Sequence, residues 1–137
     1  MVDLKFGNMS KVYNSEFYDS VIIVILDSGD YQYQTLAPLF NEYGYGFVAP
    51  AQKLVFIDGS ANLSKNTLKW IEAHEVAHII LGHKTEKNSK DEIDADTLAY
   101  KLLVGNGYHK AARLVEDKFL ERHGVELQIK TFIYEKK

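Results

Sequence analysis

The sequence predicts an α+β fold in which a small mixed sheet packs against helices from the second half of the chain. Short runs of β-branched and aromatic residues, each followed by turn residues, fill much of the first half. Apolar residues at helical spacing dominate the second half. The length of 137 residues suits one domain, and no Pro/Ser-rich linker or internal repeat divides the chain. We therefore expect a single domain over residues 1–137.

Three short apolar runs predict the strands of this sheet, at residues 21–26, 46–48 and 53–57. The first run, VIIVIL, is β-branched and too short for a typical helix, which favours a buried strand. Residues 31–43 carry apolar side chains at helical intervals and precede Gly44, so we expect a helix there. Residues 1–15 show no clear period and predict a loop or a short helix.

Three helices are predicted in the second half of the chain. The first runs through residues 70–81 with Ser64 as its N-cap, and the others cover residues 91–104 and 110–123. Glycines follow each of these segments and can end the helices. Residues 127–134 alternate apolar and polar side chains and predict a last strand or a tail.

The composition excludes several classes of protein. Cysteine is absent, which rules out a disulfide scaffold, a cysteine zinc cage and a thiol nucleophile. The net charge of −3 argues against a nucleic-acid-binding module, which usually carries a basic excess. The longest apolar run is far shorter than the roughly 20 residues needed to span a bilayer, and the N-terminus lacks the pattern of a secretory signal. We expect a soluble, cytoplasmic protein without a nucleic-acid or membrane partner.

Residues 74–78 read HEVAH, an HExxH motif inside a helical pattern. One turn separates His74 from His78, so both imidazoles lie on one face, about 6 Å apart along the axis, and can bind the same metal ion. Glu75 lies beside that face, where its carboxylate can hold a metal-bound water and take its proton. A solvated face with two incidental histidines is the alternative, but the apolar residues around the pair favour a buried metal site.

A zinc site with one open position needs a third protein ligand. We favour Glu92, because antiparallel packing of two helices joined by a short connection would bring the start of the second helix back to the histidines. Asp96 shares the face of Glu92 and can accept the N–H of a ligand histidine. Acidic residues also suit a helix N-terminus without any metal. The other candidates for the third ligand are Asp91, Asp94, Asp96 and His83.

His83 is a less suitable ligand than its proximity suggests. It follows His74 by nine residues, which places it about 180° around a continuous helix. Its spacing also misses the HExxHxxGxxH pattern. We therefore interpret His83 as a helix C-terminal residue that the helix dipole favours and that can bond a free carbonyl.

HExxH followed by ExxAD resembles the gluzincin metallopeptidases, in which the glutamate of the second motif is the third zinc ligand. Residues 53–58 and 74–83 are similar to the ImmA/IrrE family of zincin-like peptidases, whereas residues 92–112 look more like the HtpX and prenyl-protease family. The latter relatives are usually membrane proteins, and Leu98-Ala99 stands where ImmA/IrrE members often carry an aromatic–alanine pair. The resemblance covers about residues 46–112 and is to a minimal gluzincin domain with a zincin-like fold.

The resemblance implies a zinc-dependent peptidase with one Zn²⁺ per chain, held by His74, His78 and Glu92. Zinc would polarise the scissile carbonyl and activate a water, and Glu75 would act as general base and then protonate the leaving amine. The strand at residues 54–57 would form the sheet edge beside the cleft, where an extended peptide can pair. The substrate would be a peptide or protein, and a regulatory protein is one candidate, because ImmA/IrrE relatives often act on or beside DNA-binding repressors.

A non-catalytic zincin-like module, with zinc serving stability or partner binding, is the alternative function. The short chain and the lack of an obvious domain for substrate selection favour it. Glu75 argues against it, because a purely structural zinc site does not need that carboxylate. A third interpretation, a metal-free α+β domain, requires both motifs to be accidental.

Overall fold

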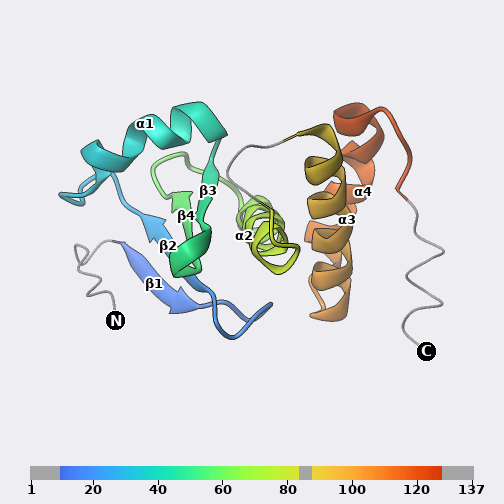
Figure 1. Cartoon of the computed structure of the whole chain (residues 1–137), viewed down its shortest axis with the longest axis horizontal. Helices are drawn as coiled ribbons and strands as arrows, with labels where there is room; N and C mark the ends of the chain where they lie inside the picture. The colour runs from blue at the N-terminus through green and yellow to red at the C-terminus, as the bar shows by residue number, and fades with distance from the viewer. Residues whose placement is uncertain (1–9, 84–87, 128–137) are drawn as a thin grey trace.

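A computed structural model describes residues 10–83 and 88–127 and confirms the α+β fold (Figure 1). Within these residues, four strands form one mixed sheet in the order β1-β2-β4-β3. The strands are β1 (Lys11–Asn14), β2 (Ile22–Leu26), β3 (Gly46–Ala49) and β4 (Leu54–Asp58). The helices are α1 (Tyr33–Tyr43), α2 (Lys65–Ile80), α3 (Ser89–Gly105) and α4 (His109–His123), with a 3-10 turn η1 at Pro50–Gln52.

The edge of the sheet beside α2 is β3, which corrects one expectation. Residues 54–57 were expected at the edge, but β4 lies between β2 and β3 and pairs with both. The pairing of β2 with β4 is parallel and therefore needs a crossover, which α1 supplies. The short η1 connection then folds β3 back onto β4 as an antiparallel neighbour, so β4 becomes an inner strand.

The other edge strand, β1, falls where the sequence predicts a loop or a short helix. It is four residues long and mostly exposed, so it leaves almost no hydrophobic period. A buried carboxylate, Glu72 of α2, ties this segment to the helix: it accepts hydrogen bonds from Tyr13 Oη (2.7 Å) and Ser15 Oγ (3.1 Å). Burial and the hydrogen bond to Glu72 raise the pKa of Tyr13 well above its usual value, so the phenol stays a donor.

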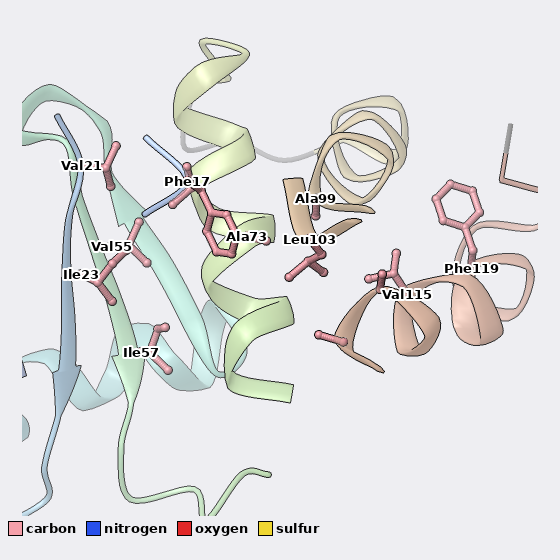
Figure 2. Close-up of a cluster of buried hydrophobic side chains, with 13 residues drawn as sticks. Phe17, Val21, Ile23, Val55, Ile57, Ala73, Ala99, Leu103, Val115 and Phe119 are labelled. Atoms are coloured by element: carbon pink, nitrogen blue, oxygen red, sulfur yellow. The ribbon is translucent and has the colours of Figure 1, made fainter. Parts of the chain in front are cut away.

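Helices cover both faces of the sheet, which explains the uninterrupted apolar run of β2. Ile23 and Val55 point into a core shared with α2, α3 and α4 (Figure 2). Val24 and Phe56 point to the opposite face, where they pack with Phe40 of α1. Because successive strand residues face opposite sides, a sheet buried on both faces needs apolar residues at every position of its inner strands.

The central helix α2 lies between the sheet and the α3–α4 pair (Figure 1). Residues 72–78 are consequently buried, the polar ones included. Ser64 caps this helix as predicted, since its side chain accepts a hydrogen bond from the Thr67 N–H at 3.2 Å. The other predicted helices are also present, with ends shifted by one or two residues. The predicted last strand or tail at residues 127–134 lies outside the described residues except for Leu127.

Candidate metal centre

Two buried imidazoles of α2 face one another at the centre of the site. His74 and His78 lie one turn apart, with ring centroids separated by 4.7 Å and ring planes at 86°. Their Nε2 atoms are 3.1 Å apart. The helical spacing of HExxH accounts for this approach, and the enclosure of α2 removes both rings from water.

Glu92, in the first turn of α3, completes a cluster of three ligand atoms. Its Oε1 lies 3.3 Å from His74 Nε2, and its Oε2 lies 3.0 Å from His78 Nε2. The three groups each place a ligand atom within 4.8 Å of the others. Two ligands bound 2.0–2.1 Å from a tetrahedral zinc ion are about 3.3 Å apart, so these separations suit such an ion. The donor set, two imidazoles and one carboxylate, therefore fits a divalent metal ion.

The other acidic candidates for the third ligand lie elsewhere. Asp94 pairs with Lys90 across one turn of α3, 2.7 Å away on the exposed face. Asp91 lies near His83, 3.4 Å from its Nε2. Asp96 lies behind His74 and contacts its other ring nitrogen. The structure thus brings Glu92, rather than these three carboxylates, to the Nε2 atoms of the histidines.

Asp96 is fully buried and binds four donors from two neighbouring helices. Its Oδ1 accepts hydrogen bonds from His74 Nδ1 (2.7 Å) and Trp70 Nε1 (3.0 Å) on α2. Its Oδ2 accepts from His123 Nε2 (2.7 Å) and Arg122 Nε (3.1 Å) on α4. Burial alone would raise the pKa of Asp96, but the hydrogen bond and charge of His74 and the charge of Arg122 outweigh burial and hold that pKa well below its usual value.

The ionised Asp96 fixes the tautomer of His74. A carboxylate can only accept, so Nδ1 of His74 carries a proton and donates it. In the neutral imidazole, Nε2 then presents a lone pair to the cluster. Burial lowers the pKa of His74, but hydrogen bonds to Asp96 and Glu92 outweigh it and raise that pKa to about 9. Negative charge around His74 therefore favours a cation at this point, either a proton or a metal ion.

Glu75 lies beside the cluster and is buried in a cleft that also reaches the sheet edge. The cleft has a volume of about 530 Å³ and runs between β3, α2, α3 and α4. Residues of these elements and of the loop before β3 line the cleft: Gly44, Tyr45, Gly46, Thr67, Trp70, Ile71, His74, Glu75, Glu92, Lys118, Glu121 and Arg122. A substrate in this cleft can reach Glu75, His74 and Glu92.

Trp70, Arg122 and His123 contribute to the site although the sequence did not predict them. Trp70 precedes His74 by four residues, so helical spacing could have placed it beside the histidine. Arg122 and His123 are 26 and 27 residues from Asp96 and gave no signal, because no local period links α4 to α3. Their positions follow from the packing of three helices around one carboxylate.

The fold and the cluster define an α+β domain with a candidate metal-binding cleft. The family model of Peptidase U49 matches residues 46–130, a segment that contains HExxH, Glu92 and α4. The chain belongs to the Peptidase U49 family, and this membership indicates a peptidase that acts on a peptide or protein substrate. No curated protein and no solved structure matches the chain significantly. Among the described helices, none is long and apolar enough to cross a membrane.

Asp96→Asn is expected to destabilise the metal-free protein by about 3–5 kcal/mol, because an amide turns two donor hydrogens toward a pocket already filled with donors. Urea unfolding in the presence of a chelator measures this. The matched control is Asp94→Asn, which removes an exposed carboxylate of the same helix and should change the unfolding midpoint little. Equal midpoints for the two variants would contradict the importance of the buried network.

Proposed function

We propose that this protein is a zinc-dependent peptidase that hydrolyses peptide bonds, with His74, His78 and Glu92 as the metal ligands and Glu75 as general base. The observation that carries the proposal is the convergence of these three ligand atoms, two of them from residues that line the same cleft as Glu75. Membership of a peptidase family supports the reaction class. The similarity of HExxH plus ExxAD to the gluzincins supports the metal and the role of the glutamate.

The chemistry divides between the metal and the protein's own groups. When bound, zinc would supply Lewis-acid activation of a water and of the scissile carbonyl. Glu75 takes the proton of the attacking water and delivers it to the leaving amine. Glu75 is buried beside the cluster and lines the cleft, so its carboxylate lies where a substrate would be cleaved. Asp96 keeps the lone pair of His74 Nε2 directed at the metal position.

The edge strand β3 is the element that we propose binds the peptide main chain. β3 pairs with β4 on one side, and among the described strands none lies on its other side. An extended peptide can add to such an edge through main-chain hydrogen bonds. Gly46 at the start of β3 lines the cleft with Glu75, so a peptide on β3 would pass the proposed base.

The metal content of the purified protein tests the ligand assignment. Wild type should carry about one zinc per chain, and His78→Ala and Glu92→Ala should lose it, because each removes one of three converging ligands. Mass spectrometry of native protein after dialysis against zinc-free buffer measures this. His109→Ala, which changes an exposed histidine of α4, should keep the metal. Zinc retained by Glu92→Ala would reject Glu92 as a ligand, and no zinc in wild type would reject the proposed metal dependence.

Glu75→Gln separates metal binding from catalysis. The amide cannot take a proton, so hydrolysis of labelled casein should fall by about 100-fold or more while zinc content stays at the wild-type value. Glu116→Gln alters an exposed carboxylate of α4 outside the cleft and should leave hydrolysis unchanged. Undiminished cleavage by Glu75→Gln would refute its role as general base. Zinc binding by wild type without any hydrolysis would instead favour the non-catalytic module.

Gly46→Ala tests the close approach of the strand to the base. A β-carbon at this position would lie 2.7 Å from Ile71 Cγ2 and 3.2 Å from Glu75 Oε2, so Ile71 must shift and Glu75 must give by a few tenths of an ångström. We expect kcat to fall by up to about 100-fold with zinc retained, because small displacements of a catalytic group are costly. Gly105→Ala, where nothing lies within 4 Å of the added carbon, is the control. A wild-type kcat for Gly46→Ala would show that Glu75 tolerates the displacement.

A further inference from the structure

The end of α2 reverses sharply and returns His83 to His78. Gly82 adopts a left-handed φ of 71°, its N–H bonds to Ile79 O at 3.1 Å, and the His83 N–H bonds to His78 O at 3.0 Å. This pair of hydrogen bonds is the Schellman arrangement, which requires a residue that tolerates positive φ at the position of Gly82. The arrangement brings the residue after the glycine over the residue five positions earlier, which here is a candidate metal ligand.

An imidazole pair occupies the place where this helix end usually has an apolar contact. His83 Nδ1 lies 2.9 Å from His78 Nδ1, and the two rings are 5.1 Å apart at 61°. His78 is 2% exposed and the His83 side chain 12%, so the contact is shielded from water. The nitrogen of His78 that contacts His83 is the one that faces away from His74 and Glu92.

Asp91 sets the direction of the hydrogen bond between His78 and His83. Its Oδ1 lies 3.4 Å from His83 Nε2, and a carboxylate only accepts, so the proton of a neutral His83 is favoured on Nε2. Nδ1 of His83 is then an acceptor, and the hydrogen on Nδ1 of His78 points to it. The distance of 3.4 Å is long for a hydrogen bond, so the orienting effect of Asp91 is mainly electrostatic. His78 Nε2 is left with a lone pair directed at the cluster.

We infer that His83 is a positioning residue that fixes the tautomer and ring orientation of His78, assisted by Asp91. The inference rests on the proposed function, because it assigns His83 a purpose only if His78 binds a metal ion. Asp96, on α3, binds Nδ1 of His74. His83, at the end of α2 itself, contacts Nδ1 of His78 in the same way. Groups that hold the outer nitrogen of a ligand histidine typically change metal affinity by 10- to 100-fold when they are removed.

Three variants test this role. His83→Leu removes the acceptor, and zinc affinity measured by competition with a chromophoric chelator should fall by about 10- to 100-fold. His83→Asn places an amide oxygen near the position of Nδ1, so it should recover most of the affinity. His109→Leu is the control, an equivalent change at an exposed histidine. Urea unfolding of the metal-free variants should give similar midpoints for His83→Leu and His83→Asn, since the role concerns the metal site.

The imidazole protons provide a readout independent of affinity and activity. Nitrogen-15 NMR of the zinc-loaded wild type should place the His78 proton on Nδ1 and the His83 proton on Nε2. A proton on Nδ1 of His83, wild-type zinc affinity in His83→Leu, or equal weakening by His83→Leu and His83→Asn would each overturn the inference. These results leave zinc binding by wild type intact, so they differ from failure of the proposed function, in which wild type itself binds no zinc.

Discussion

The buried carboxylate of Asp96 is the interaction on which the candidate site depends. Four donors from α2 and α4 meet at its two oxygens, while Asp96 itself belongs to α3. A carboxylate with no exposed surface is stable only when its oxygens are satisfied in this way. The same contacts align three helices and set the orientation of His74. One hydrogen-bonded group therefore links the packing of the three helices, which share an apolar core, to the geometry of the site.

The side of the two imidazoles that faces Glu92 requires a positive charge, whereas Asp96 on the other side supplies a negative one. Two Nε2 atoms and a carboxylate converge within hydrogen-bonding distance of one another, an arrangement that repels itself unless a positive charge lies between them. Burial lowers the pKa of His74, but hydrogen bonds to Asp96 on one side of the ring and Glu92 on the other raise that pKa to about 9, which favours a bound proton there. A divalent ion would meet the requirement for positive charge more completely, because it attracts all three groups at once. The outer partners, Asp96 and His83, hold the two rings in the orientation that such an ion needs.

Local spacing was sufficient to predict much of the fold and of the cluster. The HExxH turn, the N-cap at Ser64 and the approach of Glu92 all follow from helix geometry and from a short connection between two helices. Asp96 was expected behind a ligand histidine because it lies one turn after Glu92. Local spacing failed for β1, whose exposed residues carry no period, and for the sheet edge, which depends on strand order.

The α+β class, the central helices and the residue types that meet at the cluster could all be predicted from the sequence. They depend on contacts within a turn or between adjacent helices. Tertiary structure alone decided which strand borders the cleft, that Gly46 lies against Glu75, and that α4 supplies Arg122 and His123 to Asp96. It also gave His83 its place against His78 through the turn at Gly82. Such contacts depend on packing between distant segments, or on the path of the backbone after a helix ends, and periodicity along the chain encodes neither.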